Sequence, residues 1–187
     1  VASAASTGMY QRQRCHSHRP ASSLRVPFLS AHPSARLLDL INIKTHLNMI
    51  IKGYAAKGPN QKLEEFTYKP EILGSEDIVI KVSYCGICHS DLCMINNEWG
   101  MTQYPIIPGH EIIGEIVAVG DMVKTLKIGD KVGLGWLSAS CMTCSECMSG
   151  DHNLCTNSEA TIVGRHGGFA EYVRGHWSWA IPIPEGM

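Results

Sequence analysis

The sequence predicts a mostly β domain of the α+β class over residues 49–187, built as a partly closed barrel with loops inserted between its strands. Three observations favour this fold class. Short runs alternate apolar and polar residues with a period of two, turns containing glycine separate these runs, and no long amphipathic helical stripe occurs.

The first three strands are expected before residue 87. The runs MIIKGYAA at 49–56 and KLEEFTY at 62–68 flank the turn residues KGPN, which predicts two neighbouring strands. The run at 76–86 alternates along its length, which predicts a half-buried strand. Its alternation places four apolar residues on one face: Ile78, Ile80, Val82 and Tyr84.

One short helix and three more strands complete the domain. The run HSDLCMINNEW at 89–99 predicts a short helix capped by Ser90 or Asp91. The β-branched runs that follow are broken by the Gly-Asp turns typical of strand ends. The remaining strands are expected at 110–123, 126–136 and 167–173.

Length and charge exclude several classes of function. A chain of 187 residues accommodates one ordinary domain with a hydrophobic core. Its formal net charge of -1 gives no bulk attraction for nucleic acid or for an anionic membrane surface. No apolar run approaches the ~20 residues that cross a bilayer, which predicts a soluble protein without a membrane partner.

Residues 1–48 differ in composition from the rest of the chain. They contain six Lys or Arg against one acidic residue, Asp39, a balance of +5, and they are rich in Ser and Ala. Two interpretations fit: an organelle transit peptide, or translated sequence upstream of a true start at Met49. This leader contributes nothing to the fold prediction, and the domain is assigned to residues 49–187.

Four cysteines lie within the stretch CMTCSECMSGDHNLC, separated by two, two and seven residues. Thiolates at this spacing can surround a tetrahedral Zn²⁺ and close its coordination shell, which is typical of structural zinc. Disulfides are disfavoured because nothing resembles a secretory signal peptide. An iron–sulfur cluster stays open as the main rival, because ferredoxins also use tight CxxCxxC runs. The four residues are Cys141, Cys144, Cys147 and Cys155.

A second set of metal-type residues comes earlier in the chain. CGICHSD places Cys88 just beyond the third strand, and PGHE places His110 at the start of the next one. A Cys and a His that leave neighbouring strand ends can converge on one metal ion in an open, catalytic arrangement. Asp91 is a candidate to accept the second imidazole N–H of His110, and Ser90 is a candidate to pass a proton towards solvent.

Together these motifs resemble the zinc-dependent medium-chain alcohol dehydrogenases, especially the branch similar to cinnamyl alcohol dehydrogenase. The resemblance rests on CGICHSD, YPIIPGHEIIGEIVAVG, the four-cysteine lobe and GGFAEYV, and it covers residues 49–187 in order. Residues 109–123 fit the family pattern G-H-E-x2-G-x5-G-x2-V without a mismatch. The resemblance implies the N-terminal, GroES-like catalytic domain and assigns the four-cysteine lobe to structural zinc.

The resemblance also implies the role of each residue around the second set. Cys88 and His110 become two of three ligands of a catalytic zinc, with Glu111 beside them as an alternative ligand. Ser90 becomes the hydroxyl that relays the substrate proton, and Asp91 becomes the partner of His110.

His89 and Trp99 can each be interpreted as a functional residue or as a residue without a role in the site. His89 falls where the family contacts the pyrophosphate of the cofactor; the alternative is a solvent-facing histidine. Trp99 falls near the aromatic wall of the family's substrate pocket; the alternative is a core residue. Cys85 and Cys93 are interpreted as small packed residues.

The implied activity is hydride transfer between an alcohol and an aldehyde or ketone, with NADP or NAD bound by a Rossmann domain. Residues 1–187 contain no G-x-G-x-x-G fingerprint and no evident third cysteine ligand. We therefore expect a truncated domain that is inactive alone and holds zinc tightly only in its lobe.

Several alternatives accompany this interpretation. A stand-alone zinc-binding module without catalysis is the alternative function. We expect a small-molecule alcohol or aldehyde as the substrate, no nucleic-acid partner, and a homodimer for the full-length protein. The expected location is cytoplasmic, or an organelle if the basic leader is a genuine transit peptide.

Overall fold

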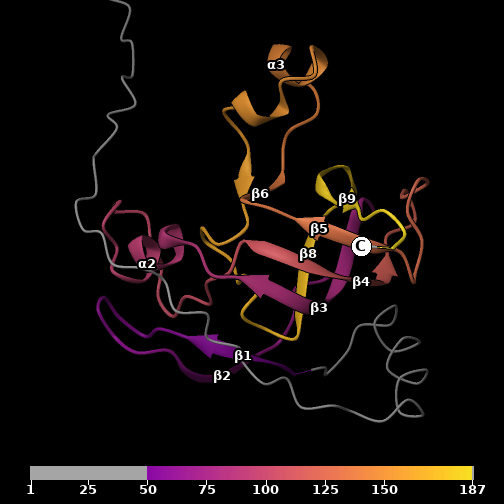
Figure 1. The fold of residues 1–187 in the computed structure, drawn as a ribbon. Coiled ribbons are helices and arrows are strands. Elements are labelled where there is room, and N and C mark those ends of the chain that lie inside the picture. The colour runs from indigo at the N-terminus through magenta and orange to yellow at the C-terminus, as the bar shows by residue number, and fades with distance from the viewer. Residues whose placement is uncertain (1–49, 187) are drawn as a thin grey trace, which may run out of the picture. The chain divides into compact units, whose positions relative to one another are not determined.

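The computed structural model describes residues 50–186, and Figure 1 shows the arrangement of their elements. The predicted leader lies outside the described residues. The strands are β1 Ile51–Ala55, β2 Glu64–Tyr68, β3 Asp77–Gly86, β4 Glu111–Val119, β5 Lys131–Leu134, β6 Leu137–Ala139, β7 Glu159–Ala160, β8 Tyr172–His176 and β9 Ile181–Pro182. The helices are α2 His89–Ile95 and α3 Ser145–Met148, with the 3-10 turns η2 His152–Leu154 and η3 Trp177–Trp179. The prediction of a mostly β fold with few helices is confirmed.

A five-stranded sheet forms the centre of the described domain. Its strand order is β8-β3-β4-β5-β9, and each neighbouring pair is antiparallel. The pairs β1–β2 and β6–β7 form two separate small sheets. Isolated bridges from Gly53 to Ala170 and from Ala56 to Ile106 connect β1–β2 to the rest. The described strands therefore make an open barrel.

The strands β3 and β4 bury one face because their apolar residues alternate. Ile78 and Ile80 of β3 are fully buried, as is Ile116 of β4. They pack in one cluster with Val132 and Leu134 of β5. Burying a side chain of this size contributes about 1.5–3 kcal/mol relative to leaving it exposed.

The prediction that Tyr84 shares the buried face of β3 is wrong. Tyr84 is 75% exposed, whereas Val82 is 6% exposed. The register of β3 against β4 shifts between these two residues, because Val82 pairs with Gly114 while Tyr84 pairs with Ile113. The extra residue of this bulge interrupts the period-two alternation, so the Tyr84 side chain turns outward.

The predicted helix at 89–99 is shorter and is capped differently. It ends at Ile95, and its N-cap is Cys88 rather than Ser90 or Asp91. Asp91 is the third helical residue, and its side chain accepts the backbone N–H of Cys88. The carboxylate therefore supports the start of the helix from inside its first turn.

The strand predicted at 167–173 begins only at Tyr172. The glycine pair before it lies instead along the segment that leads to His110. Gly167 N–H donates to the carbonyl of Ile107 at 2.8 Å, and Gly168 N–H donates to the carbonyl of Gly109 at 2.7 Å. A Cβ on Gly168 would meet Ile112 at 2.4 Å, so this close approach requires glycine.

The predicted inserted lobe leaves the large sheet through β6 and returns through β7, with α3 at its far end (Figure 1). None of the helices in residues 50–186 combines the length and apolar character that crossing a membrane requires.

Candidate metal centres

The four cysteines of the lobe converge on one point. Their Sγ atoms lie within 4.8 Å of one another, with Cys141 at 3.5 Å from Cys155 and 4.0 Å from Cys147. Metal–sulfur bonds of about 2.3 Å in a tetrahedron place the sulfur atoms about 3.8 Å apart. A disulfide requires about 2.05 Å, and the cysteines of the described residues are all free. This donor set therefore fits a structural Zn²⁺.

The backbone of the lobe favours the thiolate form of its first cysteine. Cys144 N–H donates to Cys141 Sγ at 3.4 Å. Hydrogen bonds from the backbone of Thr143 and of Cys144 lower the pKa of Cys141 to about 6. Because the thiolate is the form that binds a metal, this shift favours Cys141 as a metal ligand.

The second cluster forms where β3 ends and β4 begins. Gly86, the last residue of β3, pairs with Glu111, the first residue of β4. This register brings the ligand atoms of Cys88, His110 and Glu111 within 4.8 Å of one another. A thiolate, an imidazole and a carboxylate are all ligands of Zn²⁺, and three protein ligands leave a fourth position for another molecule.

Asp91 lies directly behind His110 and is 2% exposed. Its Oδ1 is 2.9 Å from His110 Nδ1 and also accepts the backbone N–H of Gly109 at 2.8 Å. The hydrogen bond that His110 donates to the Asp91 carboxylate raises the pKa of His110. A proton held on Nδ1 by this carboxylate leaves Nε2 as the atom available to a metal.

The carboxylate of Glu111 reaches the cluster because residue 86 is glycine. A Cβ on Gly86 would lie 2.2 Å from Glu111 Oε2. The Glu111 side chain thus occupies the space that any other residue at 86 would take.

His89 and Ser90 are the first two residues of α2, directly after the candidate ligand Cys88. Ser90 is partly buried, whereas His89 is exposed, which leaves both interpretations of His89 open. Trp99 is 40% exposed and is therefore not a core residue. Cys93 is 2% exposed, and Cys85 packs partly buried against the main core.

Trp136 is a site residue that sequence reasoning missed. Its ring contacts the ring of His110 edge to face, with centroids 5.0 Å apart, and that of Trp99 at 5.8 Å. The register of β4 against β5 accounts for this contact. Leu134 pairs with Ile112 in the antiparallel β4–β5 pair, so the residues two positions beyond this pair, Trp136 and His110, lie side by side.

The described surface has hollows that differ in size and lining. One of about 420 Å³ is lined by Gly86 and Glu111 and so borders the second cluster. The other, of about 900 Å³, is lined by residues such as Tyr68 and Arg165 and by none of the predicted site residues. Of these two hollows, the smaller one contains a candidate ligand of the second cluster, Glu111.

Several known proteins are similar to this chain in sequence and in fold. Residues 74–185 match the alcohol dehydrogenase GroES-like domain. The chain is 51% identical over 138 residues to an aldehyde reductase, AdhA, from Synechocystis, covering 74% of this chain and 41% of that protein. It is 39% identical over 142 residues to cinnamyl alcohol dehydrogenase 7 of Arabidopsis thaliana, covering 72% of this chain and 40% of that protein.

Solved structures give the same result. The cinnamyl alcohol dehydrogenase SbCAD4 of Sorghum bicolor matches with a TM-score of 0.69 at 35% identity, covering 73% of this chain and 41% of that one. A CAD from Helicobacter pylori complexed with NADP(H) matches with a TM-score of 0.69 at 31% identity, covering 74% and 42%.

The chain spans about two fifths of the length of these relatives. The similarity confirms the predicted resemblance to the branch that includes cinnamyl alcohol dehydrogenases. With more than half of its residues inside the matched domain, the chain belongs to the alcohol dehydrogenase GroES-like domain family.

Proposed function

We propose that the chain is the zinc-binding catalytic domain of an alcohol dehydrogenase or aldehyde reductase that transfers a hydride between NADP or NAD and its substrate. The observation that carries the proposal is the cluster of Cys88, His110 and Glu111, backed by Asp91, in a domain of this family. Because the relatives are longer, the activity is proposed for a protein that also carries a nicotinamide-binding domain.

In this proposal Cys88 and His110 hold the zinc, and Glu111 stands beside them as an alternative ligand. When bound there, zinc acts as a Lewis acid that polarises an alcohol or carbonyl oxygen. Asp91 keeps the proton of His110 on Nδ1, and the hydroxyl of Ser90 passes the proton of the alcohol towards solvent.

The aromatic residues support an aromatic or medium-chain aldehyde as the substrate. Trp99 and Trp136 form an edge-to-face row that ends at His110, which suits one wall of a pocket for a planar group. The similarity to a CAD complexed with NADP(H) supports NADP as the cofactor, with His89 contacting its pyrophosphate.

The lobe supports a second candidate function, a stand-alone zinc-binding module. Its four cysteines complete a tetrahedral shell without help from the rest of the domain. In both candidates the lobe zinc is structural. A cytoplasmic location is part of the first proposal, because reduced thiols suit a reducing compartment. A homodimer of the full-length protein is proposed with it on the family resemblance alone.

A chimeric enzyme separates the two candidates. Residues 49–187 replace the matching N-terminal segment of the Synechocystis aldehyde reductase, and reduction of an aromatic aldehyde by NADPH is measured. We expect activity in the chimera and a loss of about 10²-fold or more with Ser90→Ala or Cys88→Ser. A folded, zinc-loaded chimera that reduces no aldehyde contradicts the enzyme proposal and favours the binding module.

The 187-residue chain assayed by itself gives a matched comparison. We expect no turnover, because its residues contain no glycine-rich dinucleotide fingerprint. Reductase activity of the chain alone contradicts this part of the proposal.

A further inference from the structure

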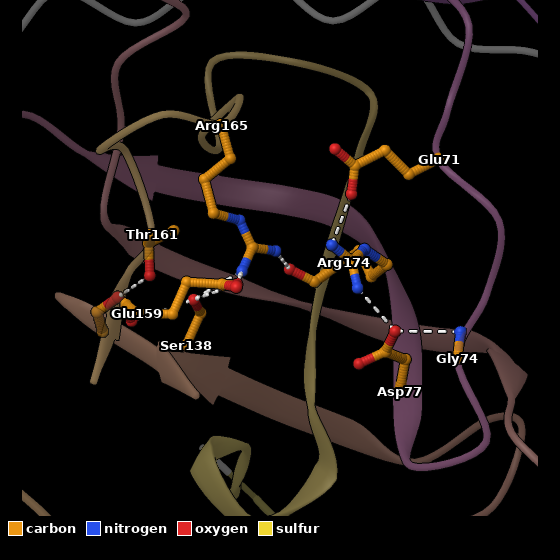
Figure 2. A network of polar contacts seen from close by, with 9 residues as sticks. Glu71, Gly74, Asp77, Ser138, Glu159, Thr161, Arg165 and Arg174 are labelled. Atoms are coloured by element: carbon orange, nitrogen blue, oxygen red, sulfur yellow. Dashed lines mark hydrogen bonds and ion pairs between the residues drawn. The ribbon is translucent and has the colours of Figure 1, made fainter. Parts of the chain in front are cut away.

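Arg165 is a buried cation outside both metal clusters. Its side chain is 10% exposed and forms an ion pair with Glu159. It also donates to the hydroxyl of Ser138 at 2.6 Å and to the backbone carbonyl of Arg174. One guanidinium thus contacts three different strands: β6, β7 and β8 (Figure 2).

The burial of Arg165 makes these partners necessary. Burial, and after it the nearby charge of Arg174, lowers the pKa of Arg165 to about 10. A charge held in such surroundings is costly unless its hydrogen bonds are satisfied. The planar fork of a guanidinium can satisfy several acceptors in fixed directions at once, which a lysine ammonium cannot match.

The strands that Arg165 joins lead to the second metal cluster. Thr161, next to β7, donates its N–H to the carbonyl of Trp136 at 2.8 Å and its hydroxyl to the carbonyl of Gly135 at 2.7 Å. The backbone of Trp136 is therefore attached to the β6–β7 pair, whose residues Ser138 and Glu159 contact Arg165.

The chain that follows Arg165 runs to the same place. Phe169 N–H donates to the carbonyl of Pro108 at 2.9 Å, beside the two bonds from the glycine pair to residues 107 and 109. Along the chain, Arg165 thus lies between Thr161, which bonds to the backbone of Trp136, and Phe169, which bonds to the segment before His110. These two bonded segments meet at the second cluster.

We propose that Arg165 is a positioning residue, whose guanidinium ties the β6–β7 pair to β8 and so holds the Trp136 indole against the His110 imidazole. The inference rests on the proposed function in treating the cluster of Cys88, His110 and Glu111 as the catalytic site. Its effect is on geometry: without the tie, the β6–β7 pair and Trp136 shift away from His110.

Arg174 supplies a matched control in the same network. It lies on β8 and pairs with Asp77 at 2.6 Å and Glu71 at 2.5 Å, so it secures the 71–77 loop (Figure 2). Both of these acids lie outside the β6–β7 pair. Arg165→Met and Arg174→Met each remove one guanidinium from neighbouring positions, but only the first removes the tie.

The test measures the NMR shifts of the carbon-bound imidazole protons of His110 in the zinc-saturated 187-residue chain at one pH. Trp136→Leu defines how far the indole displaces these shifts. We expect Arg165→Met to lose more than half of that displacement, Arg165→Lys to lose less, and Arg174→Met to keep the wild-type shifts. If Arg165→Met folds and the His110 protons keep their wild-type shifts, the proposal is overturned.

If Arg165→Met does not fold, the same NMR measurement is made on Ser138→Ala and Arg165→Lys. Wild-type shifts of the His110 protons in both of these variants overturn the proposal. The measurement needs neither substrate nor cofactor. Failure of the chimeric enzyme to reduce an aldehyde would therefore count against the proposed function, whereas unchanged His110 shifts would count against the role of Arg165.

Discussion

The Asp91 carboxylate makes three contacts at once. It accepts the backbone N–H groups of Cys88 and Gly109 and lies 2.9 Å from His110 Nδ1. One side chain thus orients two of the three candidate ligands of the second cluster, Cys88 and His110, and fixes the tautomer of the imidazole. Such partners behind a metal ligand commonly change metal affinity by about 10–100-fold.

Asp91→Asn should weaken zinc binding at the second cluster by about 10–100-fold, because the amide keeps the size but loses the charge that holds the His110 proton. Competition with a chelator measures this affinity. Asp121→Asn, at an exposed position, is the control and should leave both clusters unchanged. An unaltered affinity in Asp91→Asn would show that the carboxylate does not support the metal site.

His166 should make the stability of the domain depend on pH. Burial lowers its pKa below the usual histidine value of about 6.5, and its buried Nδ1 has no hydrogen-bond partner among the described residues. The unfolded chain therefore binds this proton more readily, so the free energy of unfolding falls as the pH drops below about 6.5.

His166→Phe keeps the aromatic contact with Tyr68, whose ring lies 4.3 Å away, and removes the titration. Urea denaturation between pH 7 and pH 5 should show a flatter fall in this variant than in the wild type. His89→Gln changes an exposed histidine and should keep the wild-type slope. Equal slopes in all three proteins would contradict the assignment to His166.

Local spacing decided which site residues could be predicted from the sequence. Cys88, Asp91 and His110 lie in short motifs or beside them, so their residue types and intervals carried the information. Trp136 was missed because its contact with His110 depends on the register between two strands. Periodicity within one strand does not reveal that register.

Within the strand β3, the bulge separates the buried Ile78, Ile80 and Val82 from the exposed Tyr84. Ile80→Ala should lower the free energy of unfolding by about 2–5 kcal/mol, because it leaves a cavity in the main core. Tyr84→Ala should change it by less than about 0.5 kcal/mol, because the ring is exposed. Chemical denaturation measures both, and a comparable loss in Tyr84→Ala would contradict the outward position of its ring.

Element types were easier to predict than element ends. The runs 49–56, 62–68 and 76–86 became β1, β2 and β3 because turn residues bound their alternation. The strand expected at 167–173 begins late, because Gly167 and Gly168 bond to the segment before His110 instead of joining the sheet. Tertiary contacts of this kind leave no periodic trace in the sequence.

At the scale of the whole described domain, the two metal clusters belong to different parts of the fold. The Cys₄ lobe is an insertion between β6 and β7 with its own complete set of ligands. The second cluster depends on the β3–β4 register and offers one Cys, one His and one Glu. Spacing alone predicted a four-cysteine metal site in the lobe, although the resemblance was needed to choose zinc, whereas the second cluster required strands to converge.

Because the two clusters differ in this way, we propose that one chain holds a tight structural zinc in the lobe and a weaker zinc at the second cluster. The direct measurement is a zinc titration of the 187-residue chain with a competing chelator. We expect two classes of site: Cys155→Ser removes the tight class, and His110→Ala removes the weak class while leaving the tight one. A single class of zinc site that His110→Ala leaves unchanged would contradict the claim.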